Sequence, residues 1–141
     1  MKLHRLGATG LTPLETLDLP NDMLWEDEFS WSPVVRKTEY SLTGALIVEV
    51  AKKQAGRPIT LRPPDQEMAW VERSVVQTLR SWQDQTALRM LLVLEYASDT
   101  RQFVVSFADG AEPMGASPVK GFPGHAGEDY FRLTLKLVEV E

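Results

Sequence analysis

The stretch that decides the fold reads LRMLLVLEY (residues 88–96), ASDTRQ (97–102) and FVVSF (103–107). Each apolar run places a large apolar side chain at every second position, from Leu88 to Tyr96 and from Phe103 to Phe107. Side chains of a strand alternate between two faces, so a period of two indicates a half-buried strand. The polar segment around Asp99 is typical of a turn. We therefore predict an antiparallel hairpin here.

Three further regions carry strand signals. Residues 130–140 alternate apolar and polar side chains, which predicts a terminal strand well inside a sheet. Residues 34–42 and 45–51 flank Thr43-Gly44 and predict a second hairpin, with Leu46, Val48 and Val50 on one half-buried face. A short strand is expected from Pro58 to Leu61, because proline suits the first position of a strand.

One helix is predicted, from about Val75 to Gln83. Its apolar residues recur with helical spacing and form one stripe: Val75, Val76, Leu79 and Trp82. Ser74 and Gln77 have the spacing of a capping box, which would start the helix. Trp82, and Trp70 before the helix, are expected in the core. The segment 68–72 fits either a strand or the lead-in to the helix.

Two regions lack such periodicity. Residues 1–33 read as an extended, irregular N-terminal arm with three prolines, and residues 109–128 as a long loop rich in glycine and proline. A loop of that length in a compact domain is usually functional or disordered. The predicted architecture is mainly β, an antiparallel β-sandwich or small barrel at residues 34–141, with one short helix and the N-terminal arm.

Composition restricts the function classes. A chain of 141 residues suggests one domain, and its net charge of −5 argues against nucleic-acid binding, which needs a basic surface. Without cysteine it has no disulfide or thiolate nucleophile. No apolar run approaches the length of a membrane span or a signal peptide, so we expect no membrane insertion and no ordinary secretion.

No catalytic signature is present in the sequence. It lacks a nucleophile elbow, a dinucleotide-binding glycine pattern and a phosphate-binding loop. His4 and His125 have no second histidine at metal-ligand spacing, and surface positions are expected for both. Glu26, Asp27 and Glu28 are consecutive, so on an extended chain their side chains diverge. We predict no enzymatic activity, no metal and no cofactor.

Aromatic residues point instead to contacts with other proteins. Trp25 and Trp31 either pack back onto their own domain or anchor a partner, since large aromatics dominate interface energetics. The candidate residues of a subunit interface are Trp25, Phe29, Trp31, Phe122 and His125.

The order of features resembles a known class of proteins. The segment 19–31 leads into YSLTG (40–44), then GRPITL (56–61), the helix near Trp70, FVVSF (103–107), a proline-rich loop and LTLKL (133–137). This arrangement is similar to that of small tail-tip proteins of tailed bacteriophages (siphophages and prophages), near the distal tail protein. The resemblance covers most of residues 15–141.

The resemblance implies a structural subunit of the phage tail tip or baseplate. Such a subunit forms a ring with copies of itself, commonly hexameric, as an adaptor between the tail tube and the tail hub. It is assembled in the cytoplasm of the bacterial host and resides in the virion tail. A collar-like ring is equally compatible. The chain lacks the large C-terminal galectin-like domain of many distal tail proteins, which leaves a role in presenting receptor-binding proteins in doubt.

Two other functions compete with this hypothesis. One is a β-sandwich module that binds carbohydrate or protein, for example a sugar held by exposed Trp25 or Trp31. The other is a hydrolase, which would need two carboxylates that converge in a cleft.

Overall fold

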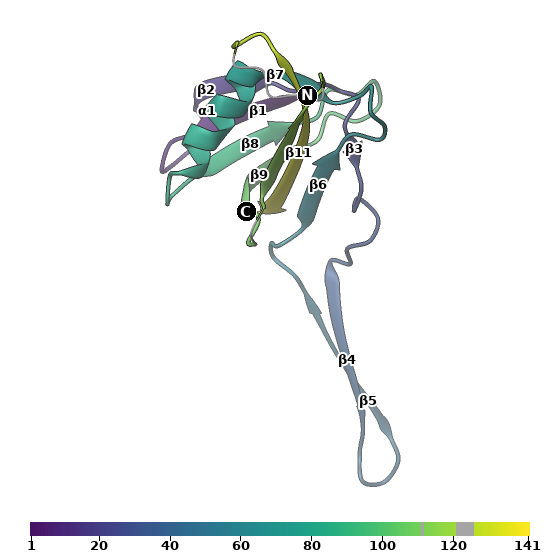
Figure 1. The fold of residues 1–141 in the computed structure, drawn as a ribbon. Coiled ribbons are helices and arrows are strands. Elements are labelled where there is room, and N and C mark those ends of the chain that lie inside the picture. The colour runs from purple at the N-terminus through teal and green to yellow at the C-terminus, as the bar shows by residue number, and fades with distance from the viewer. Residues whose placement is uncertain (111, 121–125) are drawn as a thin grey trace.

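The computed structural model describes residues 1–110, 112–120 and 126–141, and these residues are mainly β (Figure 1). They form an antiparallel sheet, one helix and a separate two-stranded hairpin. The strands of the sheet are β1 (Lys2–Leu6), β2 (Pro13–Asp18), β3 (Leu24–Trp25), β6 (Pro58–Arg62), β7 (Trp70–Glu72), β8 (Arg89–Val93), β9 (Gln102–Phe107), β10 (Met114–Pro118) and β11 (Tyr130–Glu139). The hairpin consists of β4 (Val34–Tyr40) and β5 (Leu46–Lys52).

The strand order is β2-β1-β8-β9-β11-β6-β3, and this path does not close into a barrel. The long strand β11 organises the sheet, because two short strands pair in series along each of its edges. β10 and β9 follow one edge, while β7 and β6 follow the other. The predicted position of the terminal strand deep inside the sheet is confirmed.

The core lies between this sheet and the helix α1 (Arg73–Gln83). Alternate residues of β8, β9 and β11 point into it, and most are fully buried: Met90, Leu92, Phe103, Val105, Leu133, Leu135 and Leu137. The predicted hairpin of residues 88–107 is confirmed as β8–β9, with Leu92 opposite Phe103. Burial of such side chains supplies most of the driving force for folding.

Helix α1 covers the core with Leu79 and Trp82, both buried as predicted. The predicted capping box is wrong. The helix begins at Arg73, so Ser74 lies inside its first turn, and the N-cap Glu72 makes no capping hydrogen bond with its side chain. Backbone carbonyls satisfy the first helical N–H groups instead, with Arg73 donating to Asp129 (2.8 Å) and Ser74 to Gly127 (3.2 Å). No helix in the described residues has the length and hydropathy to cross a bilayer.

The N-terminal 33 residues are not an irregular arm. They contribute β1, β2 and β3 to the main sheet, and β1 pairs with β8 on one side and β2 on the other. Several of their apolar side chains belong to the core, among them Met1, Leu3, Leu19, Met23 and Trp25. Pairing with a strand some ninety residues away stabilises this segment, and local periodicity does not reveal such a partner.

Residues 109–128 also differ from the prediction of a continuous loop. Within them, β10 pairs with β11 from Met114 opposite Leu135 to Pro118 opposite Phe131. Within the segment 68–72, residues 70–72 form the short strand β7. The strand predicted at 58–61 is confirmed as β6. Trp70 is not a core residue, because 40% of its surface is exposed.

Candidate interaction surface

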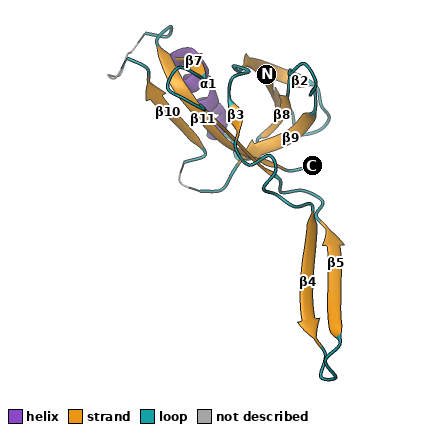
Figure 2. Ribbon diagram, turned by 90° about the vertical axis from the view of Figure 1, so that its right-hand side faces the viewer, coloured by secondary structure: helices purple, strands orange, loops and turns teal. Residues whose placement is uncertain are grey.

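The hairpin β4–β5 extends away from the body of the molecule (Figure 2). Its two strands pair only with each other among the described strands, from Val34 opposite Lys52 to Tyr40 opposite Leu46. At the tip, Gly44 adopts a positive φ of 85°, which glycine tolerates at little cost. Ser41 N–H donates to the carbonyl of Ala45 (2.8 Å) and closes the turn. The predicted hairpin is confirmed, but the half-buried face expected for it is wrong.

The strand register divides the hairpin into two unlike faces. Directly opposed residues share a face, and the face alternates along each strand. We call one the apolar face: Val34, Arg36, Thr38, Tyr40, Leu46, Val48, Val50 and Lys52. The other is the charged face: Val35, Lys37, Glu39, Ile47, Glu49 and Ala51.

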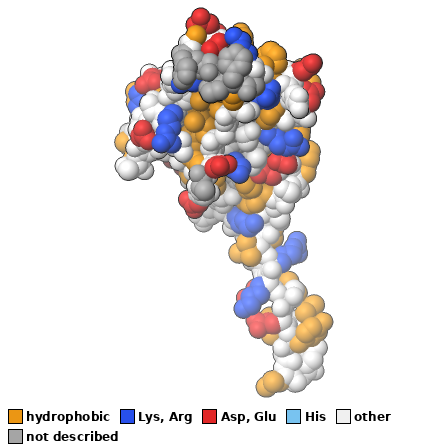
Figure 3. Space-filling model, viewed as in Figure 1, with side chains coloured by type: hydrophobic (Ala, Val, Ile, Leu, Met, Phe, Trp, Pro, Cys, Tyr) orange, Lys and Arg blue, Asp and Glu red, His pale blue; other side chains and the backbone are white. Residues whose placement is uncertain are grey.

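The apolar face carries no acid, and its large hydrophobic side chains Tyr40, Leu46, Val48 and Val50 are all exposed. Leu42 at the tip is fully exposed as well. Figure 3 shows hydrophobic side chains gathered toward the tip of the hairpin and Lys and Arg nearer the body. An isolated two-stranded hairpin is at best marginally stable in water, and contiguous exposed apolar surface usually marks an interaction site. The apolar face is therefore suited to lie against another protein.

The base of the hairpin is fixed to the body by Trp31. Cations lie over its ring, with Lys53 Nζ at 5.0 Å and the Arg57 guanidinium at 5.1 Å from the centroid. Lys53 N–H also donates to the carbonyl of Pro33 (2.8 Å), which ties the two ends of the hairpin together. These contacts connect the base of the hairpin to Arg57, the residue that precedes β6.

Three consecutive acids, Glu26, Asp27 and Glu28, hold in place the loop that runs from β3 to Trp31. Glu26 pairs with Arg62 (3.2 Å), whereas Glu28 pairs with Arg101 (2.8 Å). Asp27 accepts hydrogen bonds from the Trp25 indole N–H (3.0 Å) and from two groups of Thr60. Each acid thus has its own partners, and the prediction that they diverge is confirmed.

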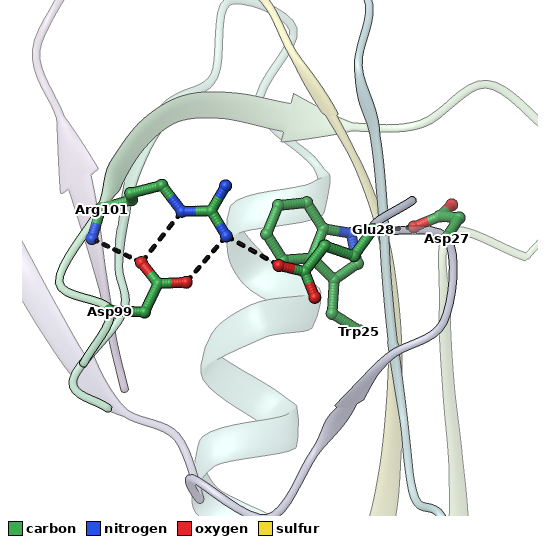
Figure 4. A network of polar contacts seen from close by, with 5 residues as sticks. All are labelled: Trp25, Asp27, Glu28, Asp99 and Arg101. Carbon is green, nitrogen blue, oxygen red and sulfur yellow. Dashed lines mark hydrogen bonds and ion pairs between the residues drawn. The ribbon is translucent and has the colours of Figure 1, made fainter. Parts of the chain in front are cut away.

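Arg101 forms the centre of a second polar network (Figure 4). Its guanidinium donates to both carboxylate oxygens of Asp99 (2.9 and 2.7 Å) and lies 5.2 Å from the Trp25 ring centroid. The hydrogen bonds from Arg101 lower the pKa of the Asp99 carboxyl. Burial, followed by the charges of Asp99 and Glu28, raises the pKa of Tyr96 nearby. We interpret this network as a brace that joins β3 to β9.

Phe29 directly follows Glu28, the last of the three consecutive acids, and is 92% exposed. The loop around it is short and held at both sides, because Ser30 donates to the carbonyl of Asp27 from its backbone N–H (3.4 Å) and its hydroxyl (3.2 Å). An apolar ring presented on an anchored loop loses little conformational freedom when it docks.

The predicted interface residues thus occupy different environments. Trp25 is only 8% exposed and packs edge-on against Phe103, with ring centroids 5.5 Å apart, so it belongs to the domain's own core. Trp31 is half-buried under two cations, and Phe29 is exposed. Phe122 and His125 lie outside the described residues.

The structure adds interaction surface that the sequence reading missed. The apolar face of the hairpin is the larger part, and its signal in the sequence is the alternation of Leu46, Val48 and Val50, which predicts a half-buried face. The other part is a pair of exposed aromatic rings, Trp70 and Tyr130, with centroids 6.0 Å apart.

We find no arrangement suited to metal binding in the described part of the chain, where no three acidic or histidine side chains converge. His4 Nδ1 lies 2.7 Å from the Thr16 hydroxyl oxygen, between the neighbouring strands β1 and β2. Glu15 on β2 accepts hydrogen bonds from the Trp82 indole N–H (3.0 Å) and from Arg5 (2.7 Å), and these lower its pKa. This carboxylate joins the helix to the sheet.

Comparison with protein-family models, with curated proteins and with solved structures finds no match to this chain.

Proposed function

We propose that this protein is a structural subunit of a phage tail tip or baseplate and that it binds neighbouring subunits through the hairpin β4–β5. The observation that carries the proposal is the apolar face of the hairpin, which projects from a folded body with nothing of the described chain paired to it. Exposure of such an apolar surface to water is unfavourable in free energy, and docking on another protein removes this unfavourable exposure.

The division of the molecule into two parts supports a structural role. The body has a continuous hydrophobic core of its own, to which no residue of the hairpin belongs. The hairpin adds little to this core and reaches outward, which is expected of an element that links one subunit to the next. The fully exposed Phe29 gives a second apolar contact near the start of the hairpin.

The specific assignment to a tail tip rests on the order of sequence features. The β-rich body, the projecting hairpin and the terminal strand are compatible with a ring subunit that joins the tail tube to the tail hub. In this proposal the chain contacts copies of itself, in a ring such as a hexamer, and other tail proteins. It resides in the virion and performs no catalysis.

The proposal is tested by isolating the assembly that contains the chain. An affinity-tagged chain is expressed in the infected or lysogenic bacterium, purified under mild conditions and imaged by negative-stain electron microscopy. We expect rings or tail tips with the tag at defined positions, and recovery of tail tube and hub proteins in fixed ratio.

Recovery of the tagged chain as a monomer, free of tail proteins, would contradict the proposal. A test variant carries Leu46→Lys and Val50→Lys on the apolar face. This variant is expected to fold normally, because both side chains are exposed, and to be absent from the particles.

A further inference from the structure

We infer that the hairpin of one copy docks on the surface around Trp70 and Tyr130 of a second copy. The inference rests on the proposed function and names its partner: the contact is between identical chains, head to tail. Three observations carry it, namely charge complementarity, the exposed aromatic rings beside the hollow and the positions of the two surfaces in the molecule.

The hairpin is a basic element on an acidic chain. Residues 34–52 contain three cations and two acids, a net charge of +1, whereas the whole chain carries −5, so the remaining residues carry −6. On the apolar face both charged residues are cations, Arg36 and Lys52. The hairpin therefore offers an apolar tip followed by two positive charges, and a surface with exposed aromatic rings and acids would complement it.

Such a surface lies beside β7 and the start of β11. Trp70 and Tyr130 are 40% and 48% exposed and border a shallow hollow of about 500 Å³. Leu19, Pro20 and Val75 contribute apolar atoms to it, and the only charged residues along its wall are Asp18 and Glu72. Within the described parts of the chain neither acid forms an ion pair.

The exposed Trp70 ring is held in one position by a hydrogen bond. Its indole N–H donates to the carbonyl of Gln66 (3.0 Å), which satisfies the polar edge and fixes the ring. Tyr130 packs beside it at a tilt of 36°. Exposed, fixed aromatic rings are typical anchors of protein interfaces, and they also attract the guanidinium or ammonium group of a partner.

The two surfaces lie at opposite ends of the molecule. Both ribbon views place β7 at the end of the body far from β4–β5 (Figures 1 and 2). The hairpin cannot reach the hollow of its own chain in this conformation, so the contact requires a second copy. A head-to-tail contact of two different surfaces generates a ring when the rotation closes and a filament when it does not.

Charge reversal and restoration test this contact with purified, full-length protein. Arg36→Glu with Lys52→Glu, and separately Asp18→Lys with Glu72→Lys, should each weaken self-association in sedimentation velocity by at least about tenfold. The chain that carries all four substitutions should recover it. The matched control exchanges Lys37 and Glu49 on the charged face (Lys37→Glu with Glu49→Lys) and should associate like the wild type.

Cross-linking provides a readout that does not depend on the charge variants. The chain contains no cysteine, so Val48→Cys and Val75→Cys place one thiol each on the hairpin and in the hollow. A mixture of the two variants should form a disulfide-linked dimer, while each variant alone, and the pair Ile47→Cys with Val75→Cys, should not.

Several outcomes would overturn the inference. These are a wild-type chain that stays monomeric at high concentration, a charge-restored variant that does not recover, or a mixture without cross-links. Glycan binding that is lost in Trp70→Ala, together with a monomeric wild type, would assign the hollow to a sugar. In each case loss of the Leu46→Lys, Val50→Lys variant from the particles would still uphold the proposed function, with a different tail protein as the partner of the hairpin.

Discussion

Asp27 binds Thr60 through both of its carboxylate oxygens. Oδ1 accepts the backbone N–H of Thr60 at 2.9 Å, and Oδ2 accepts its hydroxyl at 2.8 Å. Oδ1 also accepts the indole N–H of Trp25 at 3.0 Å, so one side chain fixes the end of β3 against β6. The loop that presents Phe29 starts from this anchor.

Removal of this carboxylate should destabilise the fold. We predict that Asp27→Ala lowers the free energy of unfolding by about 2 kcal/mol, because it leaves partly buried donors without an acceptor. Urea denaturation checks this value. The neighbouring Glu26→Ala removes an exposed ion pair with Arg62 and should change stability by less than about 0.5 kcal/mol. Equal effects of the two substitutions would show that Asp27 is no special anchor.

Glu15 should make stability depend on pH in the acid range. Hydrogen bonds from Trp82 and Arg5 lower its pKa in the folded protein from the ordinary value of 4.5. Because the folded pKa lies below the unfolded one, the contribution is complete above pH 4.5 and is lost as the pH falls through the lowered value.

The check is a series of thermal melts from neutral pH downward. The wild type should lose stability below pH 4.5 more steeply than Glu15→Gln, whose side chain does not titrate but still offers an oxygen to Trp82. Parallel curves for the two proteins would rule out a contribution of Glu15.

Amide hydrogen exchange should separate the hairpin from the body. In the unassembled chain we expect residues 34–52 to exchange much faster than β11, since an isolated hairpin opens without disrupting the core. In the assembled state the same amides should become protected. Protection of the free hairpin equal to that of β11 would mean that the hairpin is stable without a partner.

The strands with clean alternation were predictable from the sequence because alternation and burial coincide there. β8, β9 and β11 carry apolar side chains at every second position, and these side chains form the core. The helix was predictable for the same reason, through Leu79 and Trp82.

The remaining elements depend on partners that local patterns do not identify. β1 is stabilised by pairing with β8, and β10 holds a glycine and a proline, Gly115 and Pro118, yet is kept extended by its ladder with β11. In the hairpin, the alternation of Leu46, Val48 and Val50 correctly gave a common face. It could not tell whether that face is covered by the same chain or by another.

The most direct test of the account compares two adjacent residues of β5 that point in opposite directions. Val48 lies on the apolar face and is 49% exposed, whereas Ile47 lies on the charged face and is 44% exposed. Lysine at either position should leave the folded body intact, since both side chains are already in water. The fraction of each tagged variant incorporated into purified particles is the quantity to measure.

We predict that Val48→Lys lowers incorporation by at least about tenfold, because it replaces the burial of a valine, about 1.5 kcal/mol or more, by the desolvation of a charge. Ile47→Lys should be incorporated like the wild type. Equal incorporation of the two variants would contradict the claim that the apolar face of the hairpin holds the subunit in its assembly.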